Sequence, residues 1–300
     1  MGKLAFVFAG QGSQLAGMGK DLYDRFNCVK EIFDMSPEIR NICFDGPKEK
    51  LDITLNTQPA IFLMDMACAA ILNENGIKAD GAAGFSLGEI PAACYTGLMD
   101  LDQAYRFVLM RAKSMHECAQ KSKGSMIVVL KLSDEKVEEI CNSLPEAYPV
   151  NYNSPAQVVV ACADGVEEKL IKTVSENGGK SIKLAVSGAF HSPFMNEAGE
   201  NAAVYLSKEK FKEMQIHLYS NTTAKIYDNP GQLLAKQISS PVLWKKTIEN
   251  MICDGFDTFI EVGPGKTLSG LIKKINPDVR TGNVSDIPSL EIVAEEYTNA

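Results

Sequence analysis

The sequence predicts an α/β fold in which parallel strands form the core and a smaller domain is inserted. Short apolar runs next to glycine alternate with longer segments of helical periodicity, which is typical of parallel strands covered on both faces. Between about residues 121 and 190 the predicted elements become shorter. After residue 190 the alternation of short apolar runs and longer helical segments returns. A chain of 300 residues with 45% apolar side chains can bury one large core or two modest ones.

The first 120 residues predict the beginning of the parallel core. Residues 4–9 are almost wholly apolar and are followed by glycine, as expected for a buried strand. A second short strand is expected at 81–84, and helical patterns occupy residues 17–35, 58–75 and 102–119. Because helices separate these strands, the strands are expected to run parallel.

Residues 121–190 predict a separate ferredoxin-like small domain. The expected order is strand, helix, strand, strand, helix, strand, at residues 126–130, 134–143, 150–153, 157–161, 166–176 and 180–186. This is the split βαβ arrangement, in about the length that such a unit needs. Residues 1–120 and 191–300 then form one discontinuous larger domain. Its later part is expected to contain helices and strands at 193–207, 217–221, 241–254, 258–262 and 266–275.

The charge and the cysteines exclude several kinds of protein. Thirty basic and 38 acidic residues give a net charge of −8, whereas a nucleic-acid-binding protein would be expected to show a basic stripe. Eight cysteines are scattered singly without a C-x-x-C pair, so neither a metal site nor a disulfide framework is indicated. We therefore expect no bound metal and no nucleic-acid partner.

No segment of the sequence predicts a membrane span. The richest apolar run, residues 60–72, is shorter than the roughly 20 residues of a membrane helix, and Asp65 interrupts it. The apolar stretch at the N-terminus is too short for a signal peptide. We expect a cytoplasmic protein that enters no membrane and acts as a monomer.

Residues 84–88, Gly-Phe-Ser-Leu-Gly, match the G-x-S-x-G pattern of a serine presented at a sharp turn from strand to helix. A larger residue at either glycine would crowd this turn. The helix that follows directs its first N–H groups, including that of Leu87, toward negative charge that develops on a carbonyl oxygen under attack. Such strings also occur by chance, and an ordinary glycine-rich turn is the alternative.

A serine nucleophile needs a base, and the chain offers three histidines. His116 lies within a predicted helix, where a surface position is the simpler interpretation. His217 begins an apolar strand and is more consistent with a structural role. His191 stands in a turn of small residues before a helix, where a base can be held in a cleft. We therefore prefer His191.

Arg111 is a candidate for binding an acyl group that carries a negative charge. It lies in the predicted helix 102–119, which is expected to pack near the serine turn. A guanidinium can bind a carboxylate through two parallel hydrogen bonds. The alternative, an arginine on the surface of an amphipathic helix, is the commoner fate of arginines and stays open at this point.

Over nearly its whole length the chain resembles the malonyl-CoA:acyl carrier protein transacylase family and the related acyltransferase domains of polyketide synthases. The resemblance rests on ordered motifs at residues 8–14, 84–89, 109–113, 150–155, 188–193, 237–244 and 261–266. It implies an α/β-hydrolase-like catalytic domain with a ferredoxin-like insertion.

The resemblance also implies roles for particular residues. Ser86 would be the acyl nucleophile and His191 its base, with a backbone carbonyl near Gln237 orienting the imidazole. The backbone N–H groups of Gln11 and Leu87 would form the oxyanion hole. The substrate-binding positions would be Arg111, for the malonyl carboxylate, and Phe190, Asn153 and Gln237.

The implied activity is transfer of a malonyl group from malonyl-CoA to the phosphopantetheine thiol of acyl carrier protein, for fatty acid synthesis. The reaction would proceed in two half-reactions through a malonyl-serine ester. Coenzyme A enters only as a thioester substrate, so no cofactor is expected. Phe190 beside the base suggests malonyl rather than methylmalonyl. One residue departs from the family pattern, since Phe85 stands where a histidine usually precedes the nucleophile.

Three other functions stay open. The chain could be a separate acyltransferase that serves a polyketide assembly line or a malonate decarboxylase. It could be a serine hydrolase that removes stalled acyl groups from carrier proteins, although Arg111 would then have little purpose. It could also be a non-catalytic docking module, which the presence of both Ser86 and His191 disfavours.

An acidic carrier would need a basic docking surface, because this chain is also acidic. The candidates are Lys266, Lys273 and Lys274, on the helix predicted after Gly-Pro-Gly at 263–265, together with Lys180 and Lys183 at the edge of the small domain. A solvated helix face explains them equally well.

Overall fold

The computed structural model describes residues 2–186 and 188–298, and the chain divides into two compact units. The larger unit contains Met1–Ala112, Lys210–Tyr219 and Met251–Ala300. The smaller unit contains Lys113–Glu209 and Ser220–Asn250. The smaller unit therefore holds more of the chain than the predicted insertion at 121–190. Compactness does not test whether a segment folds independently, so the predicted domain boundaries stay a prediction.

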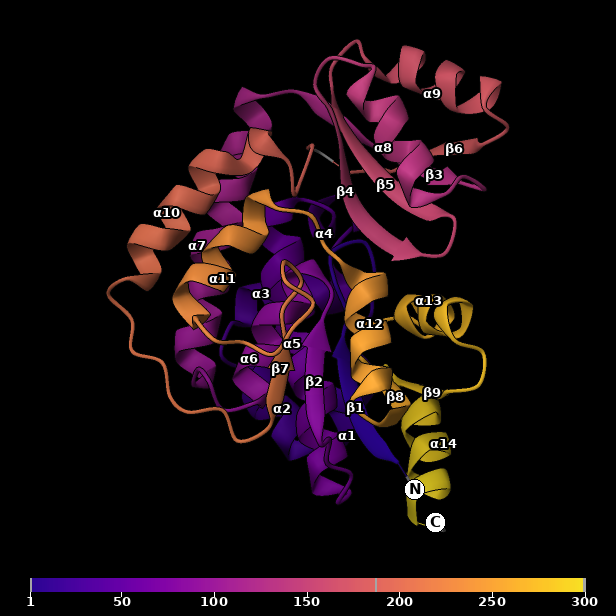
Figure 1. Cartoon of the computed structure of the whole chain (residues 1–300). Helices are drawn as coiled ribbons and strands as arrows, with labels where there is room; N and C mark the ends of the chain where they lie inside the picture. Colours follow the sequence, from indigo (N-terminus) through magenta and orange to yellow (C-terminus); the bar gives the residue numbers. More distant parts are fainter. Residues whose placement is uncertain (1, 187, 299–300) are drawn as a thin grey trace. The chain divides into compact units, whose positions relative to one another are not determined.

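The larger unit is built on a parallel five-stranded sheet with the strand order β7-β2-β1-β8-β9 (Figure 1). Its strands are β1 (Lys3–Phe8), β2 (Gly81–Gly84), β7 (His217–Tyr219), β8 (Phe256–Val262) and β9 (Arg280–Val284). The central strands are buried and rich in apolar residues, as expected for a parallel sheet covered on both faces. The predicted parallel core is confirmed.

Helices pack on this sheet and on one another. They are α1 (Lys20–Arg25), α2 (Asn27–Phe33), α3 (Pro37–Asp45), α4 (Lys48–Leu51), α5 (Thr54–Glu74), α6 (Glu89–Tyr95), α13 (Thr267–Ile275) and α14 (Ile287–Thr298). Helix α6 packs against β1 and β2, and α14 packs against β9. A single 3-10 turn, η1 (Ser86–Gly88), joins β2 to α6. Helix α7 (Leu101–Lys121) begins in the larger unit and ends in the smaller one.

Helix α5 is long and apolar enough, by length and composition alone, to cross a membrane. Most of its most apolar stretch is buried inside the protein, which is also the pattern of a core helix. Its apolar residues surround the whole helix instead of forming one stripe, as expected for a helix with protein on all sides.

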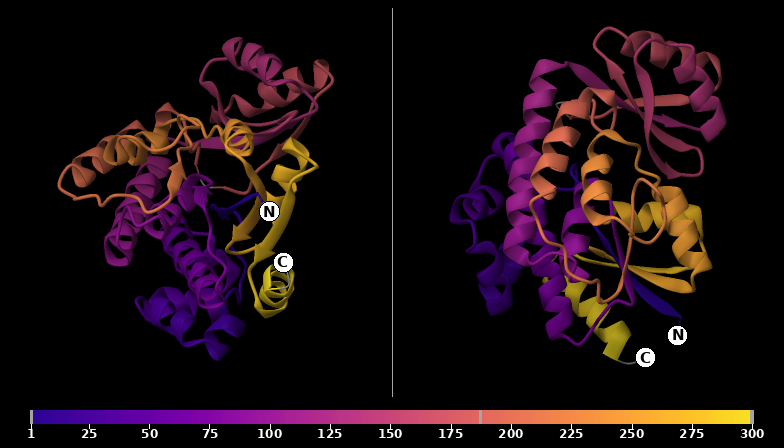
Figure 2. Two further views of the ribbon diagram at one scale, coloured as in Figure 1. Left: turned by 60° about the horizontal axis from the view of Figure 1, so that its bottom comes forward. Right: turned by 60° about the vertical axis from the view of Figure 1, so that its left-hand side comes forward.

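The smaller unit contains an antiparallel four-stranded sheet with the order β4-β5-β3-β6. The strands are β3 (Gly124–Leu130), β4 (Ala147–Ser154), β5 (Gln157–Ala163) and β6 (Lys180–Lys183). Helices α8 (Asp134–Asn142) and α9 (Glu167–Glu176) share one apolar core with one face of this sheet (Figures 1 and 2). This order of elements fits the predicted ferredoxin-like arrangement.

The rest of the smaller unit is mostly helical. It contains η2 (Pro193–Met195), α10 (Asn196–Leu206), α11 (Pro230–Lys236), η3 (Gln237–Ser239) and most of α12 (Trp244–Cys253). The backbone of Val242 extends the four-stranded sheet by pairing with β4, since Tyr152 N–H donates to its carbonyl and its own N–H donates to that of Val150.

Several stretches of the chain differ from the predicted elements. The helix expected at 17–35 is two helices, because Phe26 adopts an extended conformation with φ −119° and ψ 130°. Residues 37–51, for which no element was predicted, form α3 and α4. Strand β6 ends at Lys183, three residues before the predicted end.

Candidate active site

The serine turn is as tight as the glycine spacing predicts. Strand β2 ends at Gly84, and the chain turns through Phe85 and Ser86 into η1 and α6. A Cβ at Gly84 would lie 1.9 Å from the backbone of Gly88, and a Cβ at Gly88 would lie 2.2 Å from the carbonyl oxygen of Phe8. Only glycine fits at either position without displacing backbone.

Ser86 has a φ of 56°, in the left-handed region that serine rarely adopts. Such a conformation costs on the order of 1 kcal/mol and is kept where the surrounding structure holds it. Its side chain is at the start of the short helical segment η1–α6, as in a strand-to-helix nucleophile turn.

The guanidinium of Arg111, on α7, lies beside this serine. Its Nη2 donates to Ser86 Oγ at 3.3 Å, and its Nη1 donates to Gln58 Oε1 at 2.8 Å. Only 1% of Arg111 is exposed, so it is not the surface arginine that the sequence left open. A fixed, buried guanidinium beside this serine is suited to hold an acyl group with a negative end.

Burial lowers the pKa of Arg111 to about 10, and the negative charge of the buried Glu89 opposes this shift. The guanidinium therefore stays protonated at neutral pH. Glu89 begins α6, directly after the serine turn.

A chain of side-chain hydrogen bonds continues from Arg111 toward the loop after β1. Gln58 Nε2 donates to Gln11 Oε1 at 3.4 Å, and Gln11 Nε2 donates to Thr54 Oγ1 at 3.4 Å. Gln58 and Thr54 are fully buried on α5. The sequence did not single out Gln58, Thr54 or Glu89 as site residues. Each is a common polar residue within a helix, and no fixed spacing distinguishes it.

His191 lies in the smaller unit, with a φ of 60° and only 3% of its surface exposed. Its Nδ1 contacts the carbonyl oxygen of Gln237 at 2.8 Å. A carbonyl can only accept, so Nδ1 carries the proton and Nε2 is left as the basic nitrogen. The expected contact with the backbone of Gln237 is therefore present.

The other two histidines lie elsewhere. The Nε2 of His116, on α7, contacts the side-chain nitrogen of Gln120 at 2.9 Å on the surface, and His217 begins β7 with an exposed side chain.

Each unit brings part of the predicted set together. Ser86, Leu87, Arg111 and Gln11 belong to the larger unit, and His191, Phe190, Asn153 and Gln237 to the smaller one. Phe190 and Asn153 are 5% and 7% exposed. The Asn153 Oδ1 atom, on β4, is buried and has no hydrogen-bond partner among the described residues. In the smaller unit a cavity of about 420 Å³ is lined in part by His191, Tyr148 and Tyr152.

Phe85, where the resemblance leads one to expect histidine, packs on the loop after β1. A Cβ at Gly10 would lie 2.4 Å from the Phe85 carbonyl oxygen and 3.1 Å from its ring. The ring is half-buried and fills the space against this glycine.

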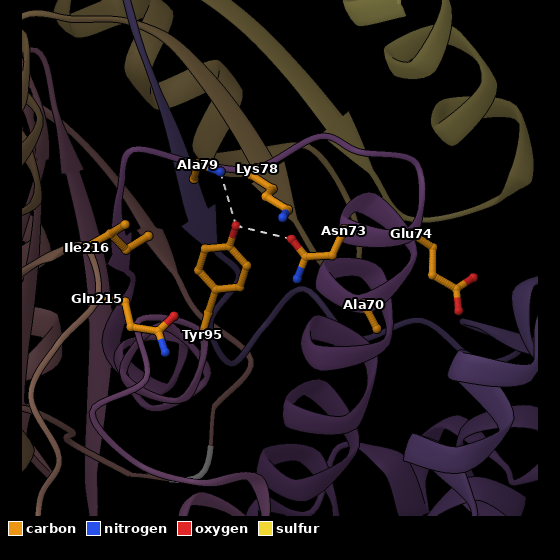
Figure 3. Close-up of a pocket in the computed structure, with 8 residues that line it drawn as sticks. All are labelled: Ala70, Asn73, Glu74, Lys78, Ala79, Tyr95, Gln215 and Ile216. Carbon is orange, nitrogen blue, oxygen red and sulfur yellow. Dashed lines mark hydrogen bonds between the residues drawn. The ribbon is translucent and has the colours of Figure 1, made fainter.

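A second cavity, of about 510 Å³, lies at the end of β2 away from Ser86. Figure 3 shows the residues that line it. Its lining includes Lys78 and Ala79, which precede β2, whereas Ser86 follows β2. The Tyr95 hydroxyl accepts from Ala79 N–H at 3.1 Å and points toward Asn73, 3.4 Å away. No base stands beside a nucleophile among its lining residues.

Over residues 2–186 and 188–298 no group of three or more His, Cys, Asp or Glu side chains is placed to hold a metal ion.

Comparisons with known proteins agree on one family. The acyl transferase domain family matches residues 5–295. Malonyl CoA-acyl carrier protein transacylase of Bacillus subtilis is 36% identical, over the whole of both chains. The crystal structure of malonyl CoA-acyl carrier protein transacylase from Clostridium perfringens superposes with a TM-score of 0.94 at 38% identity, covering 99% of this chain and 98% of that one.

A third relative was solved together with a partner. It is a malonyl-transacylase in complex with a type II polyketide synthase acyl-carrier protein, with a TM-score of 0.94 and 33% identity, covering 98% of this chain and 99% of that one.

Proposed function

Because this chain belongs to the acyl transferase domain family, we propose that it transfers the malonyl group of malonyl-CoA to the phosphopantetheine thiol of an acyl carrier protein, for fatty acid synthesis. The observation that carries the proposal is the buried guanidinium of Arg111, 3.3 Å from the Ser86 hydroxyl. A charged group at this position is suited to an acyl group on the serine that ends in an anion.

In the first half-reaction, Ser86 Oγ attacks the malonyl thioester while its proton passes to Nε2 of His191. The tetrahedral oxyanion is stabilised by the backbone N–H groups of Gln11 and Leu87. The C–S bond then breaks, coenzyme A leaves with the proton from His191, and a malonyl-serine ester remains. Arg111 binds the free carboxylate throughout.

In the second half-reaction, the carrier thiol gives its proton to His191 and attacks the ester, and Ser86 leaves with that proton. The carbonyl of Gln237 keeps the imidazole in the tautomer that both steps need. Phe190 and Asn153 line the acyl site in this proposal. An acetyl group is a poor substitute because it leaves the arginine without its partner.

We propose further that the enzyme works in the cytoplasm as a monomer, with coenzyme A only as a thioester substrate and without a cofactor, a nucleic-acid partner or a membrane. A role in polyketide synthesis is the second candidate, because one relative at 33% identity was solved with a polyketide carrier. Kinetics with the two kinds of carrier would distinguish these pathways.

The test is intact-protein mass spectrometry after incubation with malonyl-CoA. We expect a malonyl adduct that disappears when holo-carrier is added, and no adduct on Ser86→Ala. Ser207→Ala is a suitable control, because this exposed serine follows α10 and donates to the Val204 carbonyl. Hydrolysis of malonyl-CoA without transfer to the carrier thiol would instead support a hydrolase.

A further inference from the structure

Among the described residues, three exposed large hydrophobic side chains lie close together in the fold. One is on the loop after β1 and two are at the start of α5, and hydrogen bonds connect these two segments. Leu15 is 60% exposed, Ile53 42% and Leu55 39%. We call these three residues the Leu15 patch. The other exposed large hydrophobic side chains lie on five different elements, at Leu109, Ile171, Ile182, Val204 and Ile292.

Hydrogen bonds hold the two segments of the Leu15 patch together. Next to Leu15, Gln14 Nε2 donates to Asp52 Oδ1 at 2.9 Å, and Asp52 directly precedes Ile53. Thr54, between Ile53 and Leu55, accepts from Gln11. Open space lies beside two glycines of this loop, because a Cβ at Gly12 or at Gly17 would meet no atom within 4 Å. With the exposure of Leu15, Ile53 and Leu55, this makes the patch accessible from solvent.

We propose that the Leu15 patch is the docking surface for the acyl carrier protein, an inference that rests on the proposed function. The patch is continuous with the acyl site of the larger unit. Thr54 touches Gln11, and one turn further along α5 Gln58 bonds Arg111 beside Ser86. A partner seated on the patch stands next to the nucleophile, and the acceptor must stand there because its tethered thiol has to reach Ser86.

The chemistry of the patch fits an acidic carrier. The fully buried centre of a protein interface is more apolar than the rest of the surface, so exposed aliphatic side chains are suited to it. The segment just before Ile53 carries Lys48, Lys50, Glu49 and Asp52, which sum to zero charge in a protein of net charge −8. An acidic partner meets less repulsion there than over the rest of the surface. Lys50 is exposed and has no ion-pair partner among the described residues.

The lysines that the sequence suggested as a docking surface are less suitable for binding the carrier than the Leu15 patch. Lys183 pairs with Glu167 at 2.7 Å, and Lys273 donates to the Pro277 carbonyl at 3.1 Å. Lys180 and Lys183 also belong to a different unit from Lys266 and Lys273.

The experiment compares two acceptors of different size in Leu15→Glu and Leu55→Glu, with malonyl-CoA as donor. With holo-carrier as acceptor we expect kcat/KM to fall about tenfold or more, chiefly through KM, since binding would bury an unpaired charge in an apolar contact. With pantetheine, which has the thiol but no protein, we expect a change of less than about twofold. Leu15→Met should keep the carrier KM of the unsubstituted protein. The matched control is Ile292→Glu, 60% exposed on α14.

Three results would overturn the proposal. Equal losses with both acceptors would mean that the substitutions damage the acyl site. An unchanged carrier KM would mean that the patch does not bind the carrier. A dimer that dissociates on substitution, with carrier kinetics unchanged, would make the patch an interface between two copies of this chain. Failure of the proposed function differs from all three, because the unsubstituted protein would then form no malonyl-Ser86 adduct.

Discussion

In the proposed function Arg111 sets the preference for a diacid acyl group, and its removal tests this role. In Arg111→Ala the malonyl carboxylate loses two charged hydrogen bonds in a buried site, a loss of about 3 kcal/mol or on the order of 100-fold in kcat/KM. Acetyl transfer makes no use of these bonds and should gain relative to malonyl transfer. The measurement is kcat/KM with malonyl-CoA and with acetyl-CoA.

Arg106→Ala is the matched control, because it lies on the same helix but is exposed and paired with Asp102. An unchanged malonyl-to-acetyl ratio in Arg111→Ala would contradict the proposed role.

The residues around Arg111 show how far prediction from sequence reaches. Ser86 stands out because glycines at fixed offsets mark its turn, and His191 stands out because only three histidines compete. Gln58 has no such mark. Its contact with Arg111 depends on α5 and α7 packing side by side, and local sequence does not encode that packing.

The strand-turn-helix element β2–η1–α6 depends on the absence of side chains at its glycines. In Gly88→Ala the new Cβ would meet the Phe8 carbonyl oxygen at 2.2 Å, so β1 or the turn must shift. We expect the free energy of unfolding to fall by about 1–3 kcal/mol, as in other overpacked cores, and transfer activity to fall with it. Urea denaturation and the acyl-adduct assay measure the two effects.

Gly270→Ala is the opposite case, because nothing lies within 4 Å of its Cβ position in α13. It should be neutral or stabilise by up to about 1 kcal/mol, since alanine favours a helix. Gly270→Ala could instead lower the free energy of unfolding as much as Gly88→Ala does. In that case the conformational freedom of the glycine backbone, and not a steric clash of the new Cβ, would explain both losses.

Helices and strands could be predicted from the sequence where apolar runs and glycines mark them clearly. The strands β1, β2 and β8 and the six elements of the antiparallel sheet region were expected, because apolar runs and glycine breaks mark them. Helix α11, strand β9 and helix α14 were not expected. Strand β9 lies at the edge of its sheet, and most of its residues are only half-buried, so its sequence, Arg-Thr-Gly-Asn-Val, has no apolar run. Edge strands depend on pairing with a neighbour, which sequence alone does not display.

At the scale of the whole molecule, the fold class followed from the alternation of elements, whereas the division into compact units rests on contacts that the sequence does not display. The segments 113–120, 191–209 and 220–250 join the smaller unit through contacts between residues far apart in the sequence. No change in amino-acid composition marks the ends of these segments. The sequence pattern therefore indicated only the antiparallel sheet region of that unit.

We expect the stability of the whole molecule to depend on pH through Asp65. It is fully buried on α5, neither carboxyl oxygen has a hydrogen-bond partner in the described structure, and a Cβ at Gly263 would lie 1.9 Å from Oδ1. Burial, and then the charge of Glu261, raise the pKa of Asp65 well above its ordinary value. Glu261 is itself buried and accepts from the N–H groups of Leu268 and Ser269 at the start of α13.

A raised pKa in the folded state means that the native protein holds a proton that the unfolded chain releases above about pH 4. Between that pH and the folded pKa, this group therefore lowers the free energy of unfolding as pH rises, by up to about 1.4 kcal/mol per pH unit. Asp65→Asn removes the titration, so its stability relative to the unsubstituted protein should increase from pH 4 to pH 8. Chemical denaturation across this range measures the difference, with Asp24→Asn, an exposed residue on α1, as the control. Parallel pH curves for Asp65→Asn and the unsubstituted protein would mean that Asp65 is ionised in the native state and that an unseen partner compensates its charge.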